Sequence, residues 1–542
     1  MTTAYETDVL VIGGGPVGMA LVLDLKYRGV RCQLIEASDG SVSHPRVGSI
    51  GPRSMELFRR WGIADRIRVA GWPGDHSLDT AWVTQVGGYE IHRLRTGTAD
   101  SRPLPPYTPE PEQVCPQHWL APLLLEEART HPGGVVRTRS RLDGFTQHDD
   151  HVEATVTDLA EGRELRIRAR YMVAVDGASS PVRKACGIPS SARYDVMTFR
   201  NILFRAPELR ARLGDREAMF YFLMLSNQLR FPVRALDGRS LYRLTVSGTD
   251  ADARDLVTMA LAFETPVEIL SDAVWHLTHR VAERFRQDRI FLLGDAAHTL
   301  SPSGGFGMNT GICAAADLGW KLAAELDGWA GRGLLDTYEE ERRPVAVESL
   351  EEANLNLRRT MSRPVPPELH LDTPAGAEAR ARMARQLSLS DVAREFDAPG
   401  IHFGFTYRSS LIVAEPEQAP VDPRKWQQSA TPGGRAPHAW LSPGESTLDL
   451  FGRGFTLLTF PGSGRAAGSE EASGPEGVAG LEGAFAERGV PLTTVRCDDR
   501  AVADLYEQPL VLVRPDGHVA WRAEAPPDDP GVLADLVRGG RR

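Results

Sequence analysis

The chain opens on a pattern that few folds can accommodate. Residues 8–37 read "DVLVIGGGPVGMALVLDLKYRGVRCQLIEA", an apolar strand, a glycine-rich turn, a helix and a second strand that ends in Glu36. In the G-x-G-x-x-G turn, Gly13 permits the tight turn, Gly15 lets a pyrophosphate approach the backbone, and Gly18 lets the helix pack on the strand. Glu36 can accept a hydrogen bond from a ribose hydroxyl and disfavours a 2′-phosphate. The segment therefore predicts a dinucleotide-binding α/β domain for FAD or NAD.

Composition limits the remaining classes. The chain has 542 residues, 42% of them apolar and 25% charged, which is typical of a globular protein of two or three domains. It contains no apolar run of membrane-spanning length and no signal peptide, so we expect a cytoplasmic protein without a membrane partner. Five scattered cysteines without a CxxC pair predict no disulfide framework and no metal site. A formal charge of −10 without basic clusters argues against nucleic acid as a partner.

Two later segments repeat the pattern of a strand followed by a glycine turn. "RYMVAVDGASSPVRKACGI", residues 170–188, runs into Asp176 and Gly177 and then into a helix start. "RIFLLGDAAHTLSPSGGFGMNTG", residues 289–311, runs into Gly294 and Asp295 and continues as a glycine-rich loop. Each glycine costs conformational entropy on folding, so such a loop indicates that something approaches the backbone closely.

The three motifs, in this order, resemble those of the single-component FAD-dependent aromatic hydroxylases, the group A flavoprotein monooxygenases with the para-hydroxybenzoate hydroxylase fold. The pattern is most similar to dichlorophenol and phenol monooxygenases and to aromatic polyketide hydroxylases. The resemblance implies an α/β fold: a Rossmann-like FAD-binding domain interleaved with a β-sheet substrate domain, plus a C-terminal thioredoxin-like domain. We expect these domains at 1–71, 112–190 and 271–400, at 72–111 and 191–270, and at 401–542, respectively.

The resemblance also implies non-covalent FAD and assigns its contacts. The expected cofactor-binding residues are Gly13, Gly15, Pro16, Gly18, Glu36, Arg46, Gln117, Asp176, Gly177, Arg183, Gly294, Asp295, Pro302, Gly305, Gly307, Met308 and Asn309. No second nucleotide-binding motif is present, so NADPH or NADH is expected to dock transiently.

In the family that this chain resembles, a flavin reduced by NAD(P)H reacts with O2 to give a C4a-hydroperoxide, which transfers one oxygen atom to an electron-rich ring. The cofactor carries this chemistry, and the protein supplies orientation and water exclusion. We therefore expect a small aromatic substrate that is a phenol, a hydroxylated heteroaromatic or a polyketide.

Alternating segments from 218 to 248 predict strands of a second sheet, and the resemblance implies that this sheet covers the flavin and forms the substrate cavity. Alternation decides which side chains face that cavity. The cavity candidates are Tyr221, Phe222, Met224, Asn227, Arg230 and Phe231. The catalytic candidates are Tyr221, Asn227, Arg230 and Tyr242 from this region and His298 from "GDAAH", although a structural role for His298 is the more common reading.

Two alternatives stay open at this stage. A flavin-dependent halogenase would carry a W-x-W-x-I stretch, which this chain lacks. A flavin-binding interaction protein without turnover would use the C-terminal domain as its binding module. The sequence leaves the oligomeric state open, a homodimer included.

Overall fold

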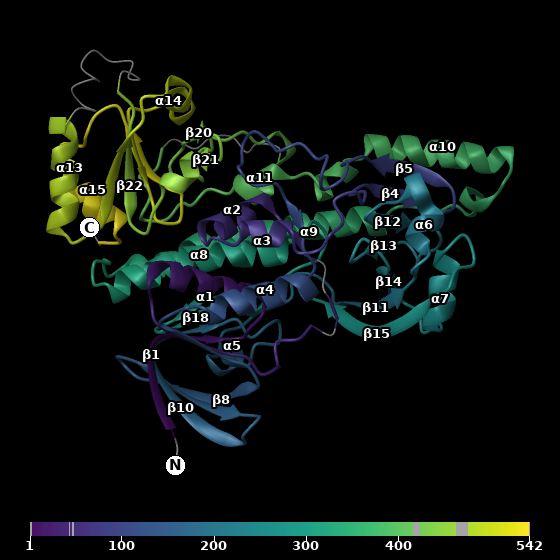
Figure 1. Cartoon of the computed structure of the whole chain (residues 1–542), viewed down its shortest axis with the longest axis horizontal. Coiled ribbons are helices and arrows are strands. Elements are labelled where there is room, and N and C mark those ends of the chain that lie inside the picture. Colours follow the sequence, from purple (N-terminus) through teal and green to yellow (C-terminus); the bar gives the residue numbers. More distant parts are fainter. Residues whose placement is uncertain (1–2, 43, 46–47, 416–422, 462–474, 541–542) are drawn as a thin grey trace.

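The computed structural model describes residues 3–42, 44–45, 48–415, 423–461 and 475–540. These ranges form three larger β-sheets that long helices connect (Figure 1). In Figure 1 the sheet that contains β1 lies at the bottom, the one that contains β15 at the right, and the C-terminal one at the upper left. Within the described ranges, every helix is too short or too polar to cross a membrane.

The first sheet is the one that the glycine motifs predicted. Its strands and covering helices are β1 (Thr3–Ile12), β2 (Cys32–Ile35), β7 (Gly134–Arg137), β8 (Ser140–Gln147), β9 (Val152–Asp158), β10 (Arg163–Ala174), β17 (Arg286–Gln287), β18 (Ile290–Leu292), α1 (Pro16–Arg28), α4 (Gln117–Arg129) and α8 (Phe306–Leu326). The order is β17-β18-β10-β1-β2-β7, and the pairs from β18 to β7 are all parallel. Helix α1 packs between α4 and α8 over these strands.

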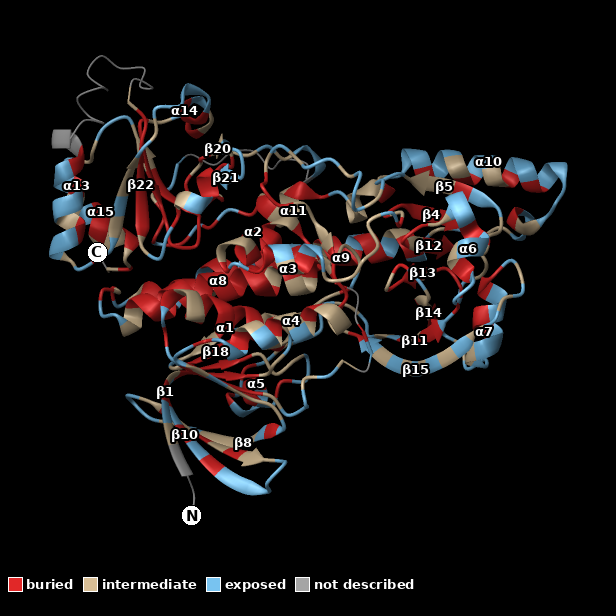
Figure 2. Cartoon of the chain, in the orientation of Figure 1, coloured by how far each residue is buried: buried red, intermediate tan, exposed pale blue. Residues whose placement is uncertain are grey.

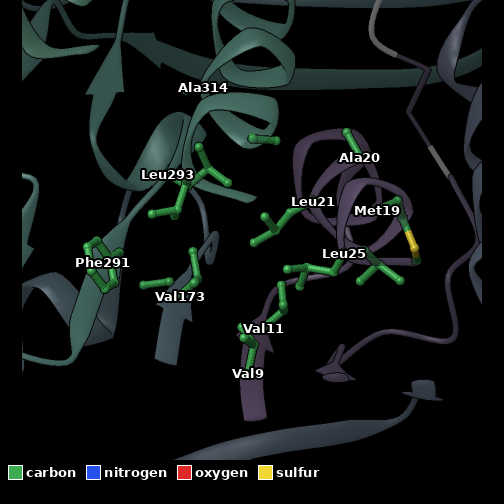
Figure 3. Packing of buried hydrophobic residues seen from close by; sticks show 14 of the residues in the cluster. Val9, Val11, Met19, Ala20, Leu21, Leu25, Val173, Phe291, Leu293 and Ala314 are labelled. Carbon is green, nitrogen blue, oxygen red and sulfur yellow. The ribbon is translucent and has the colours of Figure 1, made fainter. Parts of the chain in front are cut away.

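The core of this layer explains the apolar runs in the sequence. Val9 and Val11 of β1 and Val173 of β10 pack against Leu21 and Leu25 of α1, and all five are fully buried (Figure 3). Parallel strands that are covered on both faces are continuously apolar, which is why "VLVI" and "IFLL" do not alternate. Figure 2 shows α8 buried along most of its length.

The second sheet has seven strands in the order β15-β11-β14-β13-β12-β4-β5. Their bounds are β4 (Thr80–Val83), β5 (Glu90–Leu94), β11 (Met197–Arg205), β12 (Phe220–Leu223), β13 (Pro232–Ala235), β14 (Leu241–Ser247) and β15 (Glu268–Leu277). Buried residues of one face, such as Ile202, Tyr221 and Leu244, form a core with α6 (Leu209–Leu213) and α7 (Ala253–Ala260). Strand β15 runs through residue 277, past the domain boundary expected at 270.

The C-terminal part forms a mixed sheet in the order β23-β22-β24-β25, as expected for a thioredoxin-like domain. Its elements are β22 (Phe455–Thr459), β23 (Leu492–Arg496), β24 (Leu510–Val513), β25 (Val519–Ala523), α13 (Pro475–Glu487), α14 (Arg500–Tyr506) and α15 (Pro530–Val537).

The remaining elements include α2 (Pro52–Arg60), α3 (Ala64–Arg68), α5 (Pro181–Ala185), α9 (Thr337–Met361), α10 (Pro374–Leu389), α11 (Pro399–Phe403), β3 (Ser49–Ile50), β6 (Gln113–Val114), β16 (Arg280–Val281), β19 (His298–Thr299), β20 (Trp440–Ser442), β21 (Glu445–Ser446) and the 3-10 helices η2 (Gly294–Ala296), η4 (Pro367–His370) and η5 (Val392–Glu395).

A buried cluster of charges joins the C-terminal domain to the central helices. Arg514, in the loop between β24 and β25, donates to Asp317 of α8 at 3.0 Å and to Glu341 of α9 at 2.9 Å. Lys321 donates to the same two carboxylates at 2.9 and 2.6 Å. All four side chains are almost inaccessible to solvent. Burial alone would raise the pKa of Glu341, but Arg514 and Lys321 overcome it and hold the pKa at about 2.

The backbone of the same loop is bound from the other side. Arg28 of α1 and Arg60 of α2 donate to the carbonyl oxygen of Pro515 at 3.3 and 2.9 Å, and Arg53 of α2 donates to that of Asp516 at 2.8 Å. The loop from 514 to 517 therefore ties α1, α2, α8 and α9 to the C-terminal domain.

Replacing Arg514 tests how much this cluster stabilises the fold. Arg514→Met leaves two buried carboxylates short of a cation, so we expect a loss of about 3 to 5 kcal/mol in the free energy of unfolding. Urea denaturation followed by tryptophan fluorescence measures it. Arg496→Met is the matched control, because Arg496 forms an exposed pair with Asp498 and should change stability by less than about 1 kcal/mol. Equal unfolding curves for the two variants would contradict the role of the cluster.

Candidate flavin and substrate site

One cavity of about 910 Å³ lies between the first sheet and the second. On one side it is lined by segments that follow the carboxyl ends of β1, β10 and β18, namely Gly14–Val17, Val175 with Gly177, and Asp295. On the other side it is lined by the second sheet. Crevices at the carboxyl ends of parallel strands are where open α/β sheets bind ligands.

The first glycine motif forms a cradle that fits a diphosphate. Gly13 has φ +113°, and a Cβ there would lie 2.3 Å from the carbonyl oxygen of Val175. A Cβ on Gly18 would lie 2.0 Å from the carbonyl oxygen of Gly13, whereas a Cβ on Gly15 would meet no described atom within 4 Å. Helix α1 begins at Pro16, and none of the described side chains caps it. Its first N–H groups therefore remain available to an anion in the cavity.

Glu36 lies where a ribose would follow such a diphosphate. Its carboxylate accepts hydrogen bonds from the backbone N–H groups of Gly14 and Ser38, both at 2.7 Å, and lines the cavity. The two bonds fix the carboxylate at the end of β2. It can accept further hydrogen bonds from the two hydroxyls of a ribose.

The third motif brings a second helix N-terminus to the same cavity. Gly304 and Gly305 have φ +89° and +69°, and α8 follows without a described side-chain cap. Asn309 lines the cavity, but its amide also fixes the loop, because it accepts from Gly51 N–H at 2.8 Å and donates to the carbonyl oxygen of Gly305 at 2.8 Å. The N-termini of α1 and α8 thus both favour negative charge in this space.

The expected flavin residues fall into two groups. Those in the lining are Gly15, Pro16, Glu36, Gln117, Gly177, Asp295, Pro302, Gly305, Gly307, Met308 and Asn309. Those behind it are Gly13, Gly18, Asp176, Arg183 and Gly294. Asp176 accepts from Val182 N–H at 3.1 Å where α5 starts, and Arg183 donates to the carbonyl oxygen of Ile188 at 2.9 Å, so both support the turn. Arg46 lies outside the described residues.

Side chains alternate between the two faces of the second sheet, and this places the catalytic candidates Tyr221 and Tyr242 on the face away from the cavity. The cavity face carries Phe220 and Phe222 of β12, so Tyr221 between them points into the opposite core. There its phenol oxygen accepts from Ala218 N–H at 2.6 Å. Tyr242 has the same orientation on β14 and stacks on Phe204. The expectation that these tyrosines face the substrate is therefore corrected by strand parity.

The other three catalytic candidates are also outside the lining of the cavity. Arg230 donates to carbonyl oxygens at the end of α9, those of Thr360 at 3.4 Å and Arg363 at 3.2 Å, and also to the side chain of Asn227, which is exposed. His298 is buried on β19, and burial lowers its pKa to about 4, so it stays neutral in the fold. Among the apolar candidates, Phe222 and Phe231 line the cavity, whereas Met224 packs beside Trp82 in a separate core.

The structure also shows lining residues that the sequence did not single out. Arg234 of β13 and Arg243 of β14 are register partners whose side chains both reach the cavity. Glu395 of η5 lines it from the helical region after α10. Strand alternation would have identified the two arginines once it was known which face of the sheet lines the cavity, because in each strand the arginine alternates with residues that point into the opposite core. Glu395 belongs to no recognisable motif.

This fold and this cavity define an α/β protein with a dinucleotide cradle open to a second, aromatic-walled site. Comparisons with known proteins extend the definition. A family model described as an FAD binding domain matches residues 6–353, and one described as aromatic-ring hydroxylase, C-terminal, matches residues 429–538. The chain is 34% identical to a putative polyketide hydroxylase of Streptomyces halstedii, over 97% of this chain and 94% of that protein.

Two solved structures are similar over the whole length. RebC, soaked with chromopyrrolic acid and holding 7-carboxy-K252c, is 61% identical with a TM-score of 0.95, covering 99% of this chain and 100% of that one. Aklavinone-11 hydroxylase in a ternary complex with FAD and aklavinone is 30% identical with a TM-score of 0.79, covering 99% of each chain.

The chain belongs to the FAD-dependent aromatic-ring hydroxylases. The expected fold class, the FAD cofactor and the monooxygenase activity on aromatic compounds are thereby confirmed, with NAD(P)H as the usual co-substrate of the family. These relatives give no support to the halogenase or to the flavin-binding protein without turnover. The individual contacts between this chain and FAD stay predictions.

A single substitution tests the cradle. Gly15→Val places a branched side chain in the open space beside the α1 N-terminus, so we expect loss of FAD binding with an unchanged fold, since a φ of −69° suits valine. Flavin absorbance after gel filtration and titration of the apoprotein with FAD measure it. Gly452→Val is the control, because a Cβ there also meets no described atom within 4 Å, far from the cavity. Full FAD occupancy in Gly15→Val would refute the assignment.

Proposed function

We propose that this enzyme hydroxylates a large, planar aromatic compound that carries a carboxylate. The observation behind the proposal is the pair Arg234 and Arg243 in the cavity wall. They are direct partners on adjacent antiparallel strands, so their Cβ atoms are about 5 Å apart and both guanidinium groups serve the same space.

The electrostatics of the pair favour an anionic ligand. Burial, followed by the positive charge of Arg243, lowers the pKa of Arg234 well below its usual value, while Glu112 acts in the opposite direction. Two neighbouring cations in a buried wall repel each other, and an anion between them reduces that repulsion. A carboxylate suits the position because a guanidinium can donate two parallel hydrogen bonds to it.

The rest of the wall suits a flat ring system. Phe199, Phe220, Phe222, Phe231, Trp275 and Phe396 all line the cavity. Arg234 itself lies 4.2 Å above the centre of the Phe220 ring. Aromatic side chains offer large apolar faces, and a planar ligand can stack on them at low entropic cost. The cavity volume of about 910 Å³ is at the upper end for small-molecule sites.

One ligand of a similar protein supports a carboxylate. The ligand held by RebC is a carboxylated compound by its name, and it was obtained after soaking with an acid. RebC is also the more similar of the two solved structures described above. K252c, held by RebC-10x, and aklavinone, held by the less similar hydroxylase, are further ligands of similar proteins.

Different elements of this chain bind the cofactor and the substrate. Bound FAD supplies the redox chemistry, which the cavity orients and shields from water. The N-termini of α1 and α8 hold negative charge on the cofactor side, and the second sheet holds the aromatic ring on the other.

We also propose that O2 provides the inserted atom and that the enzyme works in the cytoplasm, as its composition predicts.

A matched pair of ligands tests the proposal. K252c, which is bound in a solved structure of the RebC-10x variant, and its 7-carboxy form differ by one carboxylate. We expect Arg243→Gln and Arg234→Gln to weaken the carboxylated ligand on the order of 10- to 100-fold, because each variant removes a charged hydrogen bond, and to change the other ligand less than about threefold. Fluorescence titration of the FAD-loaded enzyme measures both affinities. Arg205→Gln is the control, because Arg205 pairs with Glu268 at an exposed end of the same sheet and neither residue lines the cavity. Equal losses for the two ligands would contradict a carboxylate site.

A further inference from the structure

Glu395 is a carboxyl group in the cavity wall whose backbone is fixed on both sides. Arg394, one residue before it, donates to both oxygens of Glu352 on α9 at 2.7 Å. Phe396, one residue after it, packs against Phe220, Phe222 and Trp82 at ring distances of 5.5, 6.0 and 6.4 Å. With both neighbours anchored in different layers, the backbone of Glu395 is held at the cavity wall.

The surroundings of Glu395 place it between the two halves of the site. Ser303, in the glycine-rich loop expected to run along the flavin, lines the same cavity and lowers the pKa of the Glu395 carboxyl group. Phe220, which packs on Phe396, belongs to the wall expected to hold the ring and also lies under Arg234. A ring that stacks on this wall therefore shares one cavity with Arg234 and Glu395.

The charges that face Glu395 leave it able to exchange a proton. Burial raises the pKa of its carboxyl group, while Ser303, Arg363 and Arg359 lower it, and the result is about 7. Arg359 also donates to Asn356, and Arg363 lies over the ring of Trp82, so neither arginine is dedicated to Glu395. A group whose pKa lies near the working pH is well suited to accept a proton during a reaction.

The second unassigned carboxyl group of the lining has a different setting. Glu112 lies 3.9 Å from the guanidinium of Arg102. Burial raises the pKa of its carboxyl group, and the charges of Arg102 and Arg234 act in the opposite direction, so we group it with the arginines of the wall. Glu36 and Asp295 belong to the flavin motifs.

We propose that Glu395 accepts the proton of a ring O–H or N–H group of the substrate while the ring is hydroxylated. The O–H or N–H bond breaks, the proton moves to a carboxylate oxygen of Glu395, and the electron pair stays with the ring. This raises the electron density at the ortho and para carbons, where the oxygen atom is added. The inference rests on the proposed function, because it requires an aromatic substrate on the Phe220 wall.

The first test uses the FAD-loaded enzyme without substrate. Difference infrared spectra between pH 5.5 and 8.5 should show a protonated carboxyl band that titrates near neutral pH in the wild type and is lost in Glu395→Gln. Glu368→Gln is the control, because Glu368 is exposed in η4, and it should keep the band. An identical titration in wild type and Glu395→Gln would overturn the proposal.

The second test separates chemistry from binding. With the carboxylated probe used for Arg243, Glu395→Gln should lower kcat by about 10²- to 10⁴-fold with KM within threefold, and the rise of the wild-type rate with pH through about 7 should vanish. Glu395→Asp should recover part of kcat. An unchanged kcat in Glu395→Gln would overturn the proposal. If the wild type does not turn over the probe, the proposed function fails on that substrate, and the infrared titration alone decides the role of Glu395.

Discussion

The buried pairing of Arg514 with Asp317 and Glu341 is the interaction on which the arrangement of the site depends. Charges out of reach of water are costly unless each finds its partner, so this cluster favours the arrangement in which the C-terminal loop, α8 and α9 bring these charges together. Helix α8 carries this cluster in its middle and presents its N-terminus to the cavity. Helix α9 carries it near its start and brings Leu357 and Thr360 to the cavity near its end. The domain that is most distant in sequence thus fixes the helices that shape the centre of the molecule.

The cavity combines two kinds of recognition that come from two kinds of sheet. The parallel sheet ends in glycine turns and helix N-termini, so it offers backbone N–H groups to the FAD that the family binds. The antiparallel sheet offers one pleated face of side chains, in which Phe220, Arg234 and Arg243 stand on neighbouring strands. Contacts made by backbone N–H groups are kept when a side chain is substituted, whereas the chemistry of the pleated face changes with each side chain on it. Substrate choice can therefore vary while the flavin site is kept.

The site was predictable from the sequence where it is made of backbone and not where it is made of side chains. Gly13, Gly15 and Gly18 lie as the motif requires, because their roles depend on local dihedral angles and close approaches. Tyr221, Tyr242 and Arg230 were candidates for their chemistry, yet the first two point into the opposite core and the third binds the end of α9. Glu395 carried no local signal, since its place at the cavity depends on contacts of Arg394 with α9 and of Phe396 with β12, far away in the sequence.

The sequence by itself determined the class of fold and a cradle for a dinucleotide, and its resemblance to a family identified that dinucleotide as FAD. The cradle follows from short-range patterns: uninterrupted apolar runs for buried parallel strands, glycines for positive φ, and an acid at the end of the second strand. Only the tertiary structure decided which side chains meet in the cavity. A shift of one residue in a strand exchanges its two faces, and contacts across hundreds of residues depend on how whole layers pack. Arg234, Arg243 and Glu395 became one site because two sheets and the helices after them enclose the same space.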